Sequence, residues 1–408
     1  MSTRRGFFGL AGTALAASAA NGASLPRETG VDYYEKLGVT KIINAAGTYT
    51  FLTASIMPPS VQAAVAEAAK HPVRLAELQK AAGEYLAGRL RCEAALVTAG
   101  AASALTLGTA ACMTVANPAA VKQIPMDMTG LKNEVIVQKA HRYDYDHALL
   151  NCGIRFIEVQ TLDDYQRAFT EKTVMAHFFN AAEQGEISRE DWIRVAHQHG
   201  VPCFNDAAAD VPPVSNLWNY TKMGFDLVTF SGGKGMRGPQ NAGLLLGRKD
   251  LIAAAVVNDM PISETVGRGM KVAKEQIVGM VAAVDWFLGQ SDDDMQREFK
   301  ARADRISQYL KNIPTLKAKI VVPAVANQVP HLVLTYDHDR VKISAREVAD
   351  ALRHGSPVIE LNPSTGAKNS RGLTEGEDAI VVGVWMLQAG EDLIVARRLH
   401  DVLSKAAV

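Results

Sequence analysis

Residues 230 to 243, FSGGKGMRGPQNAG, place one lysine, Lys234, among glycines directly after an apolar run. The preceding residues 225–230, FDLVTF, are typical of a strand, and the chain turns apolar again at 243–247, GLLLG. Glycines at a strand end let the backbone and a ligand approach each other closely. Lys234 is then a phosphate clamp, a covalent anchor or a plain surface charge. The stretch lacks the spacing of a Walker loop, so a lysine that forms a Schiff base fits it better.

The composition sets broad limits on the function. The chain has 408 residues, of which 48% are hydrophobic, enough for a large core divided into two or three lobes. Lys plus Arg and Asp plus Glu each number 43. This balance argues against broad nucleic-acid binding and against electrostatic attachment to a membrane. The four cysteines are dispersed without a CxxC pair, so we interpret them as buried thiols.

The first 25 residues are typical of an export signal. Arg4 and Arg5 precede a short apolar, alanine-rich run that ends in small residues. Paired arginines followed by phenylalanine indicate the twin-arginine class, whose substrates fold before export, often around a cofactor. The run is too short for a stable membrane span. We therefore expect a periplasmic or otherwise exported protein, with a disordered basic start on a cytoplasmic protein as the alternative.

The remaining chain alternates short apolar strands with helices, which predicts an α/β fold with a mostly parallel sheet covered on both faces. A smaller α+β lobe is predicted toward the C-terminus. We divide the chain into an export signal at 1–25, an N-terminal arm at 26–60, a large domain at 61–290 and a small domain at 291–408. Strands are expected at 94–98, 135–138, 156–159, 174–179, 201–204, 227–230, 332–335, near 358 and at 380–384. Helices are expected at 31–38, 61–69, 75–90, 101–115, 145–151, 188–199, 272–288, 295–311, 345–353 and from 391.

Unusual residues follow several of these strands, where ligands bind in such sheets. The turn Thr98–Ser103 consists of tiny residues at a helix start, which suits either a phosphate or close helix packing. Asp206 ends a buried strand, where it either pairs with a protonated ring nitrogen or caps a turn. His141 follows another strand and either stacks on a flat cofactor or belongs to a charged surface loop. The spacing of His141 and His147 matches no metal motif, and we expect no metal.

Together these stretches are the set of groups that pyridoxal 5′-phosphate requires. A helix terminus binds its phosphate, an aspartate pairs with its pyridine nitrogen, and a lysine forms a Schiff base with its aldehyde. They occur in chain order at the ends of successive predicted strands. The sequence therefore predicts a pyridoxal-phosphate enzyme whose anchor is Lys234.

From about Ile42 to the C-terminus, the chain also resembles the fold-type I (aspartate aminotransferase-like) pyridoxal-phosphate enzymes related to bacterial selenocysteine synthase. Within them it is most similar to the subgroup that includes D-glucosaminate-6-phosphate ammonia lyase. The motif SGGKG at 231–235 with its flanks is the most specific landmark. The others are NAAGT at 44–48, MPP at 57–59, TAGAA at 98–102, GLKNE at 130–134, HR at 141–142, DAAA at 206–209, GPQ at 238–240 and GRGMKV at 267–272.

The resemblance implies a role for each matched residue. Lys234 would carry the cofactor, Asp206 would bind the pyridine nitrogen and His141 would lie over the ring. The phosphate would be surrounded by Gly100, Ala101, Ala102 and Ser231. Such enzymes are dimers or larger assemblies with sites at subunit interfaces, so the candidates for contacts with substrate or a partner subunit are Asn44, Gln240, Arg268 and Arg371. The substrate carboxylate would bind Arg353, Arg371 or Arg268.

The chain departs from the family in two ways. We expect the chain to lack the separate N-terminal tRNA-binding region of selenocysteine synthases, because the shared core begins soon after the predicted signal. An export signal also fits poorly with a phosphorylated sugar acid as substrate. We therefore expect a pyridoxal-phosphate lyase that acts on a small amino acid or amino-sugar acid. A racemase or an aminotransferase is the first alternative, and a non-catalytic binding protein with this fold is the second.

Overall fold

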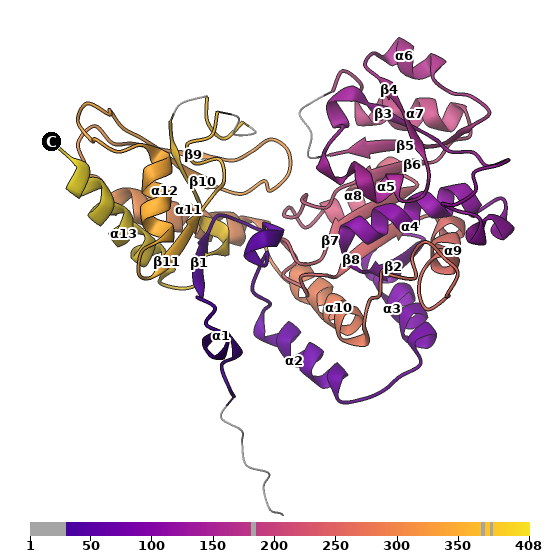
Figure 1. The fold of residues 1–408 in the computed structure, drawn as a ribbon, viewed down its shortest axis with the longest axis horizontal. Coiled ribbons are helices and arrows are strands. Elements are labelled where there is room, and N and C mark those ends of the chain that lie inside the picture. Colours follow the sequence, from indigo (N-terminus) through magenta and orange to yellow (C-terminus); the bar gives the residue numbers. More distant parts are fainter. Residues whose placement is uncertain (1–29, 181–184, 369–371, 376–377) are drawn as a thin grey trace, which may run out of the picture. The chain divides into compact units, whose positions relative to one another are not determined.

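A computed structural model describes residues 30–180, 185–368, 372–375 and 378–408 (Figure 1). The predicted export signal and Arg371 lie outside these residues. Among the described residues, 30–41 belong to a different unit from 42–408. In it, Asp32 caps the one-turn helix α1 (Tyr33–Lys36) by accepting hydrogen bonds from the amides of Tyr34 and Glu35. No helix within the described residues is both long and apolar enough to cross a membrane.

The central sheet of the described residues has seven strands in the order β2-β8-β7-β6-β5-β3-β4. All neighbouring pairs are parallel except those that β8 makes with β2 and β7. The mostly parallel sheet expected from the sequence is therefore confirmed. The strands are β2 (Ala94–Thr98), β3 (Glu134–Gln138), β4 (Arg155–Val159), β5 (Thr173–Phe179), β6 (Cys203–Asp206), β7 (Leu227–Ser231) and β8 (Gly243–Gly247).

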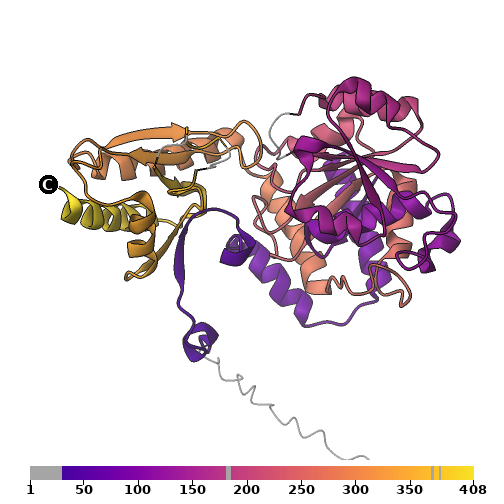
Figure 2. The ribbon, with the colours of Figure 1, turned by 45° about the horizontal axis from the view of Figure 1, so that its top comes forward.

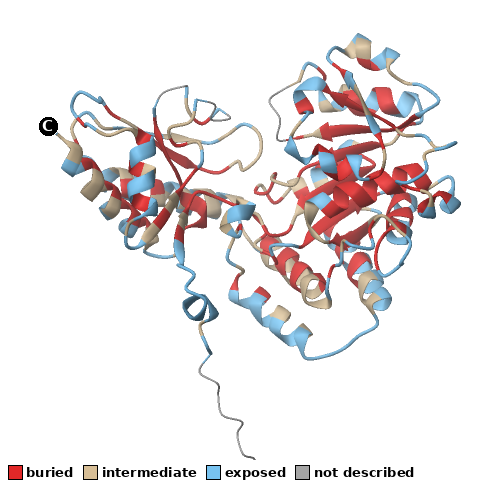
Figure 3. Ribbon diagram, viewed as in Figure 1, coloured by how far each residue is buried: buried red, intermediate tan, exposed pale blue. Residues whose placement is uncertain are grey.

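Helices cover both faces of this sheet, and each face has its own apolar cluster (Figure 1, Figure 3). Helix α4 (Gly100–Thr114) is buried along most of its length, which explains why its sequence is apolar all round. Gly108 lies against Phe204 of β6, since a Cβ there would come within 2.4 Å of the ring. The other helices are α2 (Pro59–Ala69), α3 (Leu75–Leu90), α5 (His147–Leu150), α6 (Leu162–Arg167), α7 (Arg189–Gln198), α8 (Asn216–Met223), α9 (Lys249–Asn258) and α10 (Lys274–Leu288).

The C-terminal lobe is the expected α+β arrangement, with its strands and helices in separate layers (Figure 2). Its antiparallel sheet has the order β12-β10-β9, and β1 (Ile42–Ala45) pairs in parallel with β11 (Val358–Leu361). The pairing of β1 with a strand more than 300 positions later was not predicted. The remaining elements are β9 (Lys317–Val321), β10 (His331–Thr335), β12 (Ile380–Gly383), α11 (Asp292–Tyr309), α12 (Ala345–Arg353) and α13 (Glu391–Ala406).

Several expected elements differ in their bounds from the observed ones, and two of these differences lie near the site. The strand expected at 201–204 runs from Cys203 to Asp206, because Asp206 still pairs with Phe179 and Thr229. The helix expected at 145–151 is a 3-10 turn at Asp144–Asp146 followed by the one-turn helix α5. The first difference matters for the site, since it makes Asp206 the last residue of a buried strand.

Candidate active site

The residues singled out by their chemistry gather at one edge of the central sheet. The parallel strands β3, β5, β6 and β7 end at this edge, and β2 ends there too because its two antiparallel steps through β8 restore the direction. His141 follows β3, Asp206 ends β6 and Ser231 ends β7, with Lys234 three residues later. The sheet topology therefore brings together groups that lie far apart in the sequence, as expected for a binding site at carboxyl ends of strands.

The turn before α4 is built to receive an anion. Gly100 has a φ of +81°, and Ala99 offers no side-chain cap to the helix. The first amides of a helix, here including those of Ala101 and Ala102, have no partner within the helix, and the side chains around them are tiny. The buried hydroxyl of Ser103 also lacks a hydrogen-bond partner among the described residues. A cavity of about 390 Å³ borders Ala102 and Ser103. Ser103 was not among the predicted site residues, although it stands at the end of the quoted turn.

Gly243 on β8 holds this turn in place by close backbone contact. A Cβ at Gly243 would lie 2.5 Å from the carbonyl carbon of Gly100 and 2.8 Å from the nitrogen of Ala101. We expect Gly243→Ala to displace the turn, to lower the free energy of unfolding by roughly 1–3 kcal/mol and to weaken phosphate-dependent cofactor binding. Urea unfolding and cofactor titration measure both effects. Gly88→Ala in α3 is the matched control, because nothing lies within 4 Å of its Cβ and alanine favours the helix. Equal behaviour of the two variants would contradict this account.

Asp206 is buried and accepts hydrogen bonds from the amide of Ala208 at 3.0 Å and from the hydroxyl of Tyr143. Burial raises the pKa of its carboxyl, while Tyr143, the Ala208 amide and the positive charge of Lys234 act to lower it. A protonated ring nitrogen beside Asp206 would favour the ionised carboxylate in the same way. Asp206 therefore suits its predicted role as the partner of a pyridine nitrogen.

The aromatic ring found beside Asp206 belongs to Tyr143. It stacks on Phe179 with centroids 3.8 Å apart. His141 is buried instead against the edge of Phe178, and its Nδ1 accepts a hydrogen bond from the amide of Phe179 at 3.3 Å. Burial lowers the pKa of His141 to about 4, so its imidazole is neutral at pH 7. The stacking role of His141 remains a prediction. The sequence signal for Tyr143 was its place two residues after His141, in a loop that follows a strand.

A second buried carboxyl, Asp210, lies close to the first. Burial raises its pKa to about 6, and the charge of Asp206 adds to that effect. Lys234 acts on the pKa of both Asp206 and Asp210, which places its ammonium group within electrostatic range of both. Arg189 donates a hydrogen bond from Nε to Asn180 Oδ1 at 2.7 Å on the same side. The edge of the sheet thus combines two carboxyls with two cationic side chains.

The glycines around Lys234 are explained by crowding. A Cβ at Gly235 would lie 2.1 Å from the carbonyl oxygen of Val211, and one at Gly233 would lie 2.6 Å from Cα of Gln240. Ser55 donates a hydrogen bond to the carbonyl of Gly233 at 2.6 Å. Backbone segments therefore pack directly against one another here, and the lysine is carried on a tightly held loop.

The other predicted residues take varied places. Asn44 donates to the carbonyls of Gly47 and Ala54 and accepts from the amides of Ala46 and Gly47, so its side chain organises its own loop. Gln240 is exposed and donates to the carbonyl of Thr50 at 3.0 Å. Arg268 is exposed, and its predicted contact with a partner subunit remains a prediction. Arg353 is paired with Glu360 at 3.1 Å.

The residues present fit pyridoxal 5′-phosphate. One buried polar atom at this edge, Ser103 Oγ, lacks a hydrogen-bond partner within the described part of the chain. Orphaned buried polar groups cost free energy, which a polar ligand removes. The helix terminus and Ser103 would hold the phosphate, Asp206 the ring nitrogen and Lys234 the aldehyde carbon.

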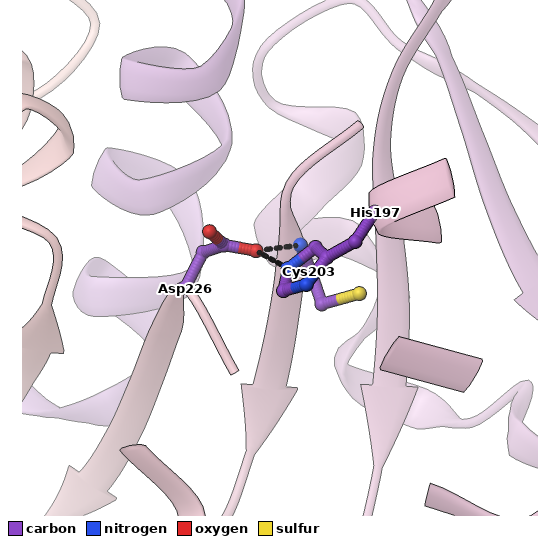
Figure 4. A group of neighbouring side chains, drawn as sticks. All are labelled: His197, Cys203 and Asp226. Carbon is purple, nitrogen blue, oxygen red and sulfur yellow. Dashed lines mark hydrogen bonds and ion pairs between the residues drawn. The ribbon is translucent and has the colours of Figure 1, made fainter. Parts of the chain in front are cut away.

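His197, Cys203 and Asp226 form a second polar cluster with metal-ligand chemistry (Figure 4). Asp226 accepts hydrogen bonds from the Cys203 amide at 2.7 Å and from Arg248 at 3.1 Å, and it pairs with His197 Nε2 at 2.8 Å. The thiol of Cys203 points away from the carboxylate, and burial raises its pKa well above the usual value. Because these protein groups already occupy the carboxylate, the cluster is explained as a structural ion-pair network.

A buried histidine of the sheet predicts a pH dependence of stability. Burial lowers the pKa of His177 from 6.5 to about 3, so the unfolded chain binds a proton here between these values and the folded chain does not. The contribution of the neutral His177 to the free energy of unfolding is fully present above pH 6.5 and declines as the pH falls toward 3. Between pH 6.5 and 5, the unfolding free energy of the wild type relative to His177→Gln is expected to fall by about 1.5 kcal/mol.

Urea unfolding of both proteins over this pH range measures that difference. The pKa values of Asp210, about 6, and Asp259, about 7, are raised, so these carboxyls increase the free energy of unfolding as the pH falls. Both proteins contain them, so their effect cancels in the difference. A difference that does not change with pH would show that His177 is protonated equally in both states.

Comparisons with known proteins bear on this site. The family model for L-seryl-tRNA selenium transferase (SelA) matches residues 42–330. A 5′-C-glycyluridine monooxygenase-decarboxylase from Streptomyces is 29% identical over 342 residues, which cover 80% of this chain and 83% of that protein. D-glucosaminate-6-phosphate ammonia lyase from Salmonella typhimurium is 28% identical over 367 residues, or 86% and 95% of the two chains. A solved structure of D-glucosaminate-6-phosphate ammonia-lyase superimposes with a TM-score of 0.78 at 26% identity, covering 92% of this chain and 99% of the other.

Proposed function

The chain belongs to the L-seryl-tRNA selenium transferase (SelA) family and is a fold-type I enzyme that depends on pyridoxal 5′-phosphate, and on this premise we propose that it is an ammonia lyase. The resemblance, the fold class and the cofactor expected from the sequence are thereby confirmed. A lyase in general is supported by the similarity to an ammonia lyase and to a decarboxylase. The reaction and the substrate class below are proposals.

We propose that the substrate is a small amino acid or amino-sugar acid with a hydroxyl on the carbon next to the amine-bearing carbon. Support comes from the relatives' names, since a seryl group and glucosaminate share this arrangement. The balance of 43 basic and 43 acidic residues speaks for a small substrate over a tRNA. The product would be a 2-oxo acid with release of ammonia.

In this proposal, each polar residue of the sheet edge has a task. Lys234 would hold the cofactor and, once the substrate amine has taken its place, would remove the proton from the substrate Cα. Asp206 would pair with the ring nitrogen and favour its protonated form, because a buried carboxylate needs a positive partner. The first turn of α4 and Ser103 orient the phosphate. The bound cofactor supplies the electron sink for the carbanion. Loss of the β-hydroxyl as water leaves an enamine, which takes up water to give the 2-oxo acid and ammonia.

The observation that carries the proposal is the meeting of Lys234, Asp206 and the α4 turn at one sheet edge. The test is an absorbance spectrum of the purified protein before and after borohydride, followed by peptide mapping and product analysis with β-hydroxy amino acids and amino-sugar acids. We expect a reduced cofactor on Lys234 and equal amounts of ammonia and 2-oxo acid. An inverted amino acid would indicate a racemase, and a need for an amino acceptor would indicate an aminotransferase. Cofactor binding without any response to amino compounds would favour a binding protein.

We further propose that the protein is exported and acts as a homodimer. The support for export is the paired arginines and the alanine-rich run within residues 1–25, which lie outside the described residues. Support for a dimer comes only from the family resemblance. Cell fractionation of the full chain, with Arg4 and Arg5 replaced by lysine as the control, tests the first proposal. Light scattering of the purified protein tests the second.

A further inference from the structure

Arg237 has an unusual backbone conformation within the lysine loop. Its φ is +54°, in the left-handed region that glycine adopts freely and that costs other residues about 1 kcal/mol or more. Its amide donates to the carbonyl of Lys234 at 3.0 Å, and the next amide, of Gly238, donates to the carbonyl of Gly232 at 2.8 Å. These two hydrogen bonds close the loop and fix Arg237 relative to Lys234. Strained residues with side chains concentrate at functional sites, so this outlier calls for an explanation.

The guanidinium of Arg237 has no counter-ion among the residues that the structure describes. The side chain is half-buried, its Nε is buried without a hydrogen-bond acceptor, and no ion pair joins it to a carboxylate within the described residues. Its charged neighbour is Arg302, whose positive charge, together with burial, lowers the pKa of Arg237. Arg302 is itself satisfied by Glu298 and by the carbonyl of Leu387. A partly buried cation beside a like charge is destabilised unless an anion pairs with it.

The other arginines predicted as partners of the substrate carboxylate are either already paired, exposed or outside the described residues. Arg353 pairs with Glu360 and Asp350 on α12 and β11. Arg268 is exposed and lies in a loop of the large lobe, and Arg371 lies outside the described residues. By contrast, Arg237 lies in the Lys234 loop and has a half-buried guanidinium without an ion-pair partner among the described residues.

We propose that Arg237 binds the α-carboxylate of the amino-acid substrate. The inference rests on the proposed function and deepens it, since the amine that reaches the Lys234 position carries its carboxylate on the same carbon. The planar fork of arginine accepts a carboxylate in two parallel hydrogen bonds. Binding would supply the missing acceptor for Nε and separate Arg237 from Arg302 electrostatically. Arg237 is therefore a substrate-binding residue that selects acids over uncharged amines.

The test is spectral titration of the holoenzyme with D- and L-serine, with the carboxylate-free analogue serinol as the comparison. In Arg237→Gly, which suits the left-handed backbone, the dissociation constant for serine should rise by roughly 10- to 100-fold. The constant for serinol and the spectrum of the bound cofactor should not change. Arg237→Lys should give an intermediate value, because it keeps the charge without the fork. Arg353→Gln is the control and should bind serine like the wild type.

A second arm separates this inference from the proposed function. It uses maleate, a dicarboxylate that carries no amine, and follows its effect on the pH titration of the cofactor absorbance. One outcome is that the wild type binds maleate in a way that depends on Arg237 and yet responds to no amino acid. That result would support Arg237 as a carboxylate-binding residue and contradict the proposed amino-acid substrate. Serine and maleate constants that are unchanged in Arg237→Gly, or a loss of serine binding in Arg353→Gln alone, would overturn the inference. So would a wild type that binds neither probe.

Discussion

Replacement of Lys234 by alanine is expected to abolish the borohydride-reducible link between cofactor and protein and to lower turnover at least about 10³-fold. In the proposed mechanism the lysine is both the covalent anchor and the base at the substrate Cα, and general-base catalysis alone contributes about 10²- to 10⁴-fold. Absorbance before and after borohydride reports the first role, and ammonia release reports the second. The fold should survive, because the crowded backbone of the loop depends on its glycines and not on the lysine side chain.

Lys222→Ala is the matched control for this experiment. Lys222 is an exposed lysine in α8, and its loss should change neither the spectrum nor the rate. Full activity in Lys234→Ala would contradict the assignment of the anchor. Loss of the absorbance with activity retained would place the chemistry on another group.

Replacement of Asp206 by asparagine is expected to have the second largest effect, a loss of turnover of roughly 10²- to 10³-fold. Asparagine keeps the size of the side chain and an oxygen for the Ala208 amide, but it removes the negative charge that, in the proposed mechanism, favours a protonated ring nitrogen. Breaking a buried charge pair costs about 3–5 kcal/mol, which sets the scale of the loss. Steady-state ammonia release and the dissociation constant for pyridoxal phosphate measure the two consequences.

Tyr143→Phe provides the comparison for Asp206→Asn. It removes one hydrogen bond to the same carboxyl and leaves the charge, so its loss of turnover should be smaller, near 10-fold. If Tyr143→Phe were as damaging as Asp206→Asn, the tyrosine would have a role of its own in catalysis. If Asp206→Asn kept wild-type turnover, the ring nitrogen would need no carboxylate partner, and the proposed task of Asp206 would be wrong.

Much of the fold and the cofactor class was predictable from local sequence. Short apolar runs separated by helical periodicity indicated the parallel sheet, because burial on both faces imposes that pattern on each strand by itself. The glycines around Lys234 and the tiny residues at Thr98–Ser103 marked close approach of backbone to ligand, which is also a local requirement. These signals, taken in chain order, were sufficient for pyridoxal phosphate.

The details of the site depended on pairings that no local signal reports. The antiparallel β8 brings Gly243 against the turn of Gly100, and only the three-dimensional packing shows that contact. The pairing of β1 with β11 is likewise non-local. Three features became visible once the neighbours were known: the hydrogen bond of Tyr143 to Asp206, and, within the part of the chain that the structure describes, Ser103 without a hydrogen-bond partner and Arg237 without a counter-ion. The sequence by itself determined which chemical groups stand at strand ends. The tertiary structure decided which of them meet and which lack partners, because hydrogen bonding and desolvation depend on neighbours brought together from distant parts of the chain.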